Sequence, residues 1–113
     1  MKIDFKKGDG LVPVIIQNPN TFQVLMLGYM NEEAFLTTKK TKKVVFYSRS
    51  KKRLWKKGET SGNELLVKNI LTDCDSDTLL IFALPKGPTC HKGNISCFDN
   101  DTNVGFIYSL ENI

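Results

Sequence analysis

Residues 12–36 decide the fold, and they read VPVIIQ (12–17), NPNT (18–21), FQVLMLGYM (22–30) and NEEAFL (31–36). The first and third segments are apolar and rich in β-forming residues, and the polar turn residues between them predict a β-hairpin. Asn31 then precedes two glutamates, a pattern typical of a helix N-cap with acids in the first turn. We therefore expect a short helix that runs to about Lys40.

The rest of the chain predicts more short strands. Three further apolar runs are typical of strands, at residues 44–48, 65–71 and 79–84. Residues 49–63 are polar and punctuated by glycine, which indicates an ordered loop or ribbon, and residues 86–97 indicate another loop. With one helix among short strands, the expected fold is α+β, mostly antiparallel β-sheet with a short helix. Residues 104–110 suggest a last strand or the start of a helix.

The basic residues are concentrated in one stretch. The 113 residues include 16 Lys and Arg against 12 Asp and Glu, and ten of the basic residues lie from Lys39 to Lys57, where no acid occurs. Such a stretch attracts phosphates, although it also suits a solvated charged face. No apolar run approaches the roughly 20 residues that cross a bilayer, and the N-terminus lacks a signal-peptide core. We expect a cytoplasmic protein with no membrane partner.

Three cysteines are present: Cys74, Cys90 and Cys97. An odd number without an export signal argues against a disulfide framework, which leaves buried apolar residues, a nucleophile or metal ligands. Three thiolates and a water would form an open zinc site of the catalytic kind. The only histidine, His91, adjoins Cys90 and suits acid–base work near neutral pH. The alternative is two buried cysteines beside a surface histidine.

Asp73, Asp75 and Asp77 alternate along the chain. In an extended segment they share one face, with Cys74 on the other, and their oxygens suit Mg²⁺ or Ca²⁺. An EF-hand loop is excluded, because Thr78 and Leu84 stand where that loop needs Gly and Glu. The alternative is a solvated turn between two strands.

Residues 48–63 combine basic side chains, hydroxyls and glycines, which suits phosphate binding. Trp55, the only tryptophan, is a candidate for stacking on a base or for the core. The same composition also fits single-stranded RNA binding, although no recognisable RNA-binding motif accompanies it.

Taken in order, these motifs resemble those of the phosphoribosyl-AMP cyclohydrolase family, histidine-biosynthesis enzymes that open an adenine ring. The matching segments are YMNEEA (29–34), YSRS (47–50), LWKKGETSGN (54–63), DCDSD (73–77), GPTCH (87–91) and SCF (96–98). The resemblance covers residues 10–98. Gly28, Glu64 and Thr89 depart from the residues familiar in the family, which are Ala, Gln and Ala, and none of these changes removes a metal ligand.

The resemblance implies hydrolysis of the N1–C6 bond of phosphoribosyl-AMP. It implies zinc on Cys74, Cys90 and Cys97, and Mg²⁺ on Asp73, Asp75 and Asp77. It also implies a homodimer whose active site lies at the interface and takes ligands from both chains. We expect His91 to be catalytic, taking a proton from water and passing it to N1. The expected substrate-binding residues are Arg49, Trp55, Lys57, Glu59, Thr60, Ser61 and Gly62.

The expected domain organisation is a cyclohydrolase domain at residues 1–103 and a tail at residues 104–113. The tail resembles the junction into the phosphoribosyl-ATP pyrophosphohydrolase domain of bifunctional relatives, which suggests that the chain is half of a longer protein. The expected partner is a small-molecule substrate and not nucleic acid. One alternative is a single-stranded RNA-binding module with structural zinc, although an Asp triplet without metal would repel the phosphates of the RNA. The other alternative is a different zinc hydrolase that acts on purine-like substrates.

Overall fold

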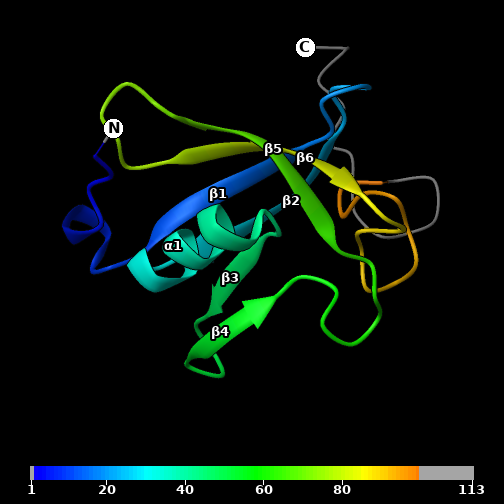
Figure 1. Ribbon diagram of the computed structural model, residues 1–113, viewed down its shortest axis with the longest axis horizontal. Helices are drawn as coiled ribbons and strands as arrows, with labels where there is room; N and C mark the ends of the chain where they lie inside the picture. The colour runs from blue at the N-terminus through cyan, green and yellow to red at the C-terminus, as the bar shows by residue number, and fades with distance from the viewer. Residues whose placement is uncertain (1, 100–113) are drawn as a thin grey trace, which may run out of the picture.

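The computed structural model describes residues 2–99 and is shown in Figure 1. In chain order the elements are a 3-10 helix η1 (Lys6–Gly8), β1 (Val12–Gln17), β2 (Val24–Met30), α1 (Glu32–Thr41), β3 (Val45–Ser48), β4 (Arg53–Lys56), β5 (Leu65–Thr72) and β6 (Leu79–Pro85). The expected element at residues 104–110 and the domain boundary after residue 103 lie outside the described residues. None of the helices within residues 2–99 is long and apolar enough to cross a membrane.

β1 and β2 form the predicted hairpin. They pair antiparallel from Val12 opposite Met30 to Gln17 opposite Val24. β2 begins two residues later than the apolar run, because Phe22 has a positive φ of 61° and its N–H closes the turn on the Asn18 carbonyl at 2.8 Å. The turn thus takes one of the apolar residues that the pattern assigned to the strand.

The main sheet is mixed. Its strand order is β2-β1-β6-β5, with antiparallel pairing at each outer pair and parallel pairing between β1 and β6. The predicted α+β class is confirmed, and antiparallel pairing predominates, but the sheet is not antiparallel throughout. The central strands are distant in sequence, so no local turn sets their relative direction.

α1 begins and ends as predicted. The Ala34 N–H donates to Asn31 Oδ1 at 2.8 Å, and the helix stops before Lys42, whose φ is +61°. Its buried residue Thr38 joins the helix to β3, because the Thr38 hydroxyl donates to the Val45 carbonyl at 3.2 Å and accepts from the Val45 N–H at 3.0 Å. This exchange fixes β3 against the helix.

β4 lies inside the stretch predicted as an ordered loop or ribbon. It pairs antiparallel with β3 to make a separate two-stranded sheet. That sheet packs closely on β2, because a Cβ at Gly28 would lie 2.6 Å from the Phe46 ring. Glycine at position 28 therefore removes a steric obstacle between the two sheets.

One hydrophobic core joins the two sheets and the helix. Partly buried Leu54 and Trp55 of β4 pack against it. Its fully buried large side chains include Phe46, Ile16, Leu25, Met30, Leu65, Leu79 and Ile81.

Candidate metal and substrate site

The predicted loop at residues 86–97 leaves β6 and returns to the start of β2. The Cys97 N–H donates to the Leu25 carbonyl at 2.8 Å, and the Ser96 hydroxyl donates to the Val24 carbonyl at 2.6 Å. These bonds hold the end of the loop on an edge strand of the main sheet.

A tight turn within this loop positions Cys90 and His91. The Cys90 N–H donates to the Asn94 carbonyl at 3.0 Å, and the Gly93 N–H donates back to the Cys90 carbonyl at 2.9 Å. Gly93 takes a φ of +89°, which glycine adopts without steric cost. Cys90 is buried, whereas His91 next to it is exposed.

Cys90 and Cys97 interact with each other inside this loop. Burial raises the pKa of the Cys97 thiol, the neighbouring Cys90 raises it further, and the charge of Lys57 opposes both effects. Two thiols held together suit a soft metal such as zinc, which binds cysteine as thiolate. The pair therefore fits part of a zinc site.

A second loop, at residues 58–63, is held against the first. A Cβ at Gly87 would lie closer than van der Waals contact to the Asn63 side-chain oxygen, so glycine allows this approach without a shift of the Asn63 side chain. Beside it, the Lys86 N–H donates to the Glu64 carbonyl at 2.9 Å. These contacts bring together two of the motifs found in the sequence.

A cavity of about 400 Å³ lies where the two loops meet. It is lined by Trp55, Lys57, Thr60, Ser61, Asn63, Pro88, Thr89, Cys90, His91 and Gly93. Four of the expected substrate-binding residues therefore share one cavity with Cys90 and with the only histidine.

Trp55 belongs both to the core and to the cavity. Its ring packs on Phe46 with 5.8 Å between centroids, and the Lys57 ammonium lies 5.4 Å from the Trp55 ring centroid. The two roles considered for this residue are thus compatible, because the core fixes the orientation of the ring that lines the cavity.

Arg49 lines a neighbouring cavity of about 270 Å³, which shares Trp55 with the first. Its guanidinium stacks on Tyr29 at 4.0 Å from the ring centroid. This contact holds the positive charge near the first cavity without placing it inside.

Glu59 and Gly62 do not line either of these cavities. The Glu59 carboxylate pairs with Arg53 at 3.3 Å, and this contact lowers the pKa of Glu59. Gly62 has a φ of +79°, and its N–H closes the loop on the Gly58 carbonyl at 2.8 Å. In this structure both residues shape the loop at residues 58–63.

The three aspartates converge, although not in the expected way. One oxygen from each of Asp73, Asp75 and Asp77 lies within 4.8 Å of the others. The segment is a turn and not an extended strand, because Ser76 has a φ of +62° and an Asp73 oxygen accepts the N–H groups of Asp77 and Thr78 at 3.1 and 3.2 Å. Three hard oxygen ligands so close fit a cation such as Mg²⁺.

Cys74 lies far from the other two cysteines. It is exposed in the turn between β5 and β6, whereas Cys90 and Cys97 lie beyond the other end of this hairpin. Figure 1 shows the two regions on opposite sides of the molecule, with the turn near the N-terminus and the later loop in orange. Within residues 2–99, the aspartates are the only group of three or more potential ligands that comes together.

Comparison with known proteins identifies the family. Residues 26–99 match the family described as phosphoribosyl-AMP cyclohydrolase. The chain belongs to the phosphoribosyl-AMP cyclohydrolase family. The matched region contains every residue of the cavity and all three cysteines.

Similar relatives carry the name histidine biosynthesis bifunctional protein HisIE. The chain is 56% identical over 113 residues to that of Escherichia coli O157:H7, an alignment that covers 99% of this chain and 56% of the relative. It is 58% identical over 116 residues to the protein of Vibrio cholerae serotype O1, an alignment that covers 99% of this chain and 55% of the relative. It is 59% identical over 104 residues to the protein of Staphylococcus epidermidis, an alignment that covers 92% of this chain and 48% of the relative. This cyclohydrolase-family chain thus spans about half the length of the curated relatives it matches.

Three features of this cyclohydrolase-family chain were not predicted from sequence. Lys7 contacts two of the aspartates, Glu64 pairs with three lysines, and the buried Thr89 hydroxyl has no hydrogen-bond partner in the described structure. Glu64 and Thr89 both differ from the residues familiar in the family, and this difference is the only feature of the sequence that draws attention to them. Lys7 gave no signal, because it is one lysine among several near the N-terminus.

Proposed function

We propose that this chain catalyses the hydrolytic opening of the adenine ring of phosphoribosyl-AMP at its N1–C6 bond, a step of histidine biosynthesis. The observation that carries the proposal is the single cavity in which Trp55, Lys57 and two loop hydroxyls meet Cys90 and His91. The family match supports the reaction, and the relatives' names support the pathway. A biosynthetic hydrolase of this kind also fits the expected cytoplasmic location.

Zinc is the first metal in this proposal, held by Cys90, Cys97 and a third cysteine. When bound, zinc supplies the Lewis acidity that lets water act as a nucleophile near neutral pH. Burial raises the pKa of the Cys97 thiol, so binding of a metal to this thiol is coupled to the loss of its proton.

A second copy of the chain supplies the third cysteine, Cys74, in this proposal. β6 has seven residues, from Leu79 to Pro85, and a strand of that length spans about 20 Å. Zinc–sulfur bonds are about 2.3 Å long, so one chain with this geometry does not bring all three thiols to one ion. A homodimer with shared sites reconciles the proposed ligand set with the fold.

An exposed apolar surface supports the dimer. Val24 and Leu27 of β2 are 40% and 45% exposed, and Ile95 and Phe98, in the segment bonded to the start of β2, are 58% and 60% exposed. Grouped apolar side chains of this kind are typical of protein interfaces. They lie next to the Cys90–Cys97 pair, where the proposal needs the second copy.

His91 carries the proton in the proposed reaction. The oxygen of water forms a bond to C6 while His91 accepts its proton. As the oxygen adds, the π electron pair of the bond between C6 and its exocyclic nitrogen moves onto that nitrogen. The C6–N1 bond then breaks, and N1 keeps the electron pair and takes the proton back from His91. The hydroxyl proton passes to the exocyclic nitrogen, and C6 becomes the carbonyl carbon of a carboxamide. Its exposed position beside buried Cys90 allows His91 to reach both water and the substrate ring.

The residues that line the wall of the cavity opposite Cys90 and His91 orient the substrate in this proposal. The fixed ring of Trp55 offers a face for the adenine, and Lys57, Thr60 and Ser61 offer donors to a phosphate. The substrate carries a second phosphate on its other ribose, and Arg49 in the adjoining cavity is placed to bind it. We retain Glu59 and Gly62 as residues that shape this wall.

Mg²⁺ is the second metal in the proposal, held by Asp73, Asp75 and Asp77. When bound, Mg²⁺ supplies positive charge that complements a substrate phosphate. The Asp73 oxygen that accepts two backbone N–H groups is fixed in place, so part of the ligand set is preorganised.

Intramolecular ion pairs disfavour the RNA-binding alternative. Lys43 and Lys56 of the basic stretch pair with Glu64, and Arg53 pairs with Glu59. Charges neutralised within the fold contribute less to a phosphate backbone contact.

The proposal is tested by the ultraviolet absorbance of phosphoribosyl-AMP after addition of the purified protein with Zn²⁺ and Mg²⁺. We expect the adenine absorbance to change as the ring opens, and a strong zinc chelator to abolish the change. Unchanged absorbance from zinc-loaded dimer would contradict the proposal, and salt-dependent RNA binding would then favour the alternative.

The second proposal concerns residues 104–113, which we infer lead into a pyrophosphohydrolase domain. The bifunctional names of the relatives support it. A parent gene that stops after residue 113 would contradict it.

A further inference from the structure

The N-terminal segment is docked on the turn that carries the three aspartates. The Asp4 N–H donates to the Ser76 carbonyl at 2.8 Å, and the Lys7 N–H donates to Asp4 Oδ1 at 3.2 Å. One backbone bond therefore ties the segment to the turn, and Asp4 sets the direction in which the chain enters η1.

This arrangement puts an ammonium group between two candidate metal ligands. Lys7 Nζ lies 2.9 Å from Asp75 Oδ2 and 2.9 Å from Asp77 Oδ2. It takes one oxygen from each carboxylate, which is the way a metal ion would bridge them. Lys7 thus neutralises part of the negative charge of the turn and contacts two of the three carboxylates that the proposed cation would need.

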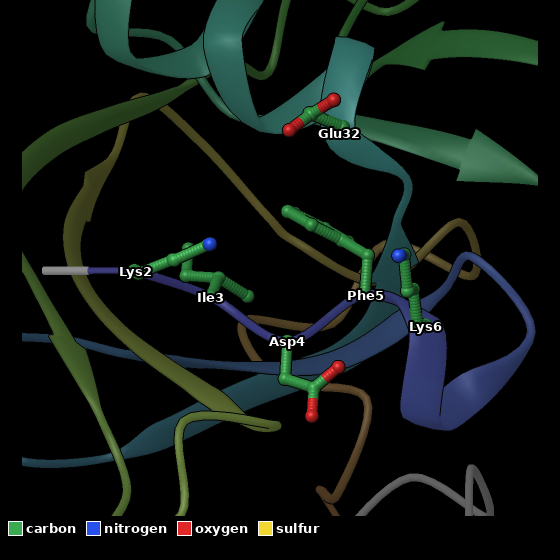
Figure 2. Close-up of a pocket in the computed structure, with 6 residues that line it drawn as sticks. All are labelled: Lys2, Ile3, Asp4, Phe5, Lys6 and Glu32. Atoms are coloured by element: carbon green, nitrogen blue, oxygen red, sulfur yellow. The ribbon is translucent and has the colours of Figure 1, made fainter.

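The backbone that carries Lys7 is anchored separately. Phe5 packs on Phe35 of α1 with 6.2 Å between ring centroids, and Ile3 also packs against the core. Figure 2 shows Phe5 on the side of the segment that faces Glu32, with Asp4 on the opposite side. Because these contacts do not involve Lys7, its side chain can leave the carboxylates while the segment stays in place.

We propose that Lys7 is a built-in competitor for the divalent cation at Asp75 and Asp77, so that the cation binds by displacing the Lys7 ammonium. This inference rests on the magnesium site of the proposed function. The tether keeps the ammonium at a high effective concentration, which lowers the apparent affinity for the cation. The site then fills only when the free cation is abundant.

The exposure of the ion pairs makes the exchange feasible. The side chains of Lys7 and Asp75 are 50% and 54% exposed, and that of Asp77 is 26% exposed. Solvent screens pairs of this kind, so each contributes little free energy and is readily broken. Mg²⁺ carries twice the charge and prefers carboxylate oxygens, so it outcompetes a single ammonium once it is available.

The first test measures cation binding directly, by calorimetric titration of the zinc-loaded full chain with Mn²⁺ and with Mg²⁺. We compare the wild type with Lys7→Met and with Lys6→Met, a neighbour that removes the same charge but makes no ion pair within residues 2–99. We expect Lys7→Met to bind about fivefold tighter than Lys6→Met, because Lys7→Met removes two exposed ion pairs that each contribute little on their own. Equal or weaker binding by Lys7→Met overturns the proposal.

The second test follows Lys7 itself in the wild type. Amine-directed acetylation is mapped by mass spectrometry with and without Mg²⁺, and Lys6 is the internal reference. We expect Mg²⁺ to increase the labelling of Lys7 relative to Lys6, because the Lys7 ammonium is held 2.9 Å from two carboxylate oxygens until the cation displaces it. Unchanged relative labelling when calorimetry shows a bound cation would mean that Lys7 and the cation bind together, which overturns the proposal.

The failure of this inference is distinguishable from failure of the proposed function. If neither the wild type nor Lys7→Met binds cation more tightly than Asp75→Asn does, the magnesium site is wrong and the Lys7 proposal falls with it. Zinc-dependent turnover of phosphoribosyl-AMP, measured by absorbance, would still test the cyclohydrolase reaction separately.

Discussion

Glu64 holds together three separate parts of the chain at the scale of single residues. Its carboxylate pairs with Lys43 before β3 at 3.3 Å, with Lys56 at the end of β4, and with Lys86 after β6 at 3.0 Å. The hydrogen bonds from Lys56 and Lys86 lower the pKa of Glu64 to about 2. These contacts stabilise the junction beside the loop that carries Cys90.

The pKa of Glu64 predicts a specific pH dependence of stability. A carboxyl whose pKa falls from 4.5 unfolded to about 2 folded contributes its full stabilisation above pH 4.5 and loses it as pH falls towards 2. Glu64→Gln cannot titrate, so its deficit in unfolding free energy should be largest near neutral pH and shrink over that window. Urea unfolding of both proteins checks this, and a deficit that stays constant or grows in acid would refute the assignment.

His91 is predicted to matter for turnover and not for metal binding. His91→Ala should keep its zinc, because the thiols hold the metal, and should lose about 10²- to 10⁴-fold in turnover, the usual contribution of acid–base catalysis. Metal analysis and the absorbance assay measure the two effects, and Lys92→Ala is a control at the next exposed position. A zinc-loaded His91→Ala protein with full activity would remove His91 from the mechanism.

At the scale of elements, the loops at 58–63 and 86–97 depend on one glycine contact. Gly87→Ala would place its new Cβ closer than van der Waals contact to Asn63 Oδ1, so the Asn63 side chain must shift and the contact between the loops is weakened. We expect a loss of about 1–3 kcal/mol in unfolding free energy, together with weaker substrate binding. Gly8→Ala is the matched control, because no atom lies within 4 Å of a Cβ there, and a Gly87→Ala protein as stable and active as Gly8→Ala would contradict the account.

The elements also show which parts of the fold could be predicted. The hairpin, the helix with its Asn31 cap, and the strands after residue 64 all follow from local signals that the structure confirms. β4 was missed because its four residues are mostly basic or aromatic, and its strand pairing depends on β3. The parallel pairing of β1 with β6 was missed because no local turn encodes it.

At the scale of the whole molecule, the proposed metal ligands were predictable but their arrangement was not. The alternation predicts Cys74 on the face away from the aspartates only if the segment is extended, and the segment is a turn. Nothing in the sequence indicates that Cys74 lies at the opposite end of a hairpin from Cys90 and Cys97. Lys7 approaches Asp75 across 68 positions of sequence, a contact that only the folded chain creates. The shared site of a homodimer remains a prediction, supported by the separation of the cysteines.

Mixing two inactive variants tests that shared site most directly. If Cys74 from one chain completes the site of the other, a dimer of Cys74→Ala with Cys90→Ala contains one intact site and one that lacks both residues. Each variant alone should not open the ring of phosphoribosyl-AMP. After random reassortment in the presence of zinc, the mixture should recover about a quarter of wild-type turnover. The control is a mixture of Cys90→Ala with Cys97→Ala, which should recover nothing, because every site then lacks a ligand from the same loop. A first mixture that stays inactive although heterodimers have formed, or a Cys74→Ala protein that is fully active alone, would contradict the account.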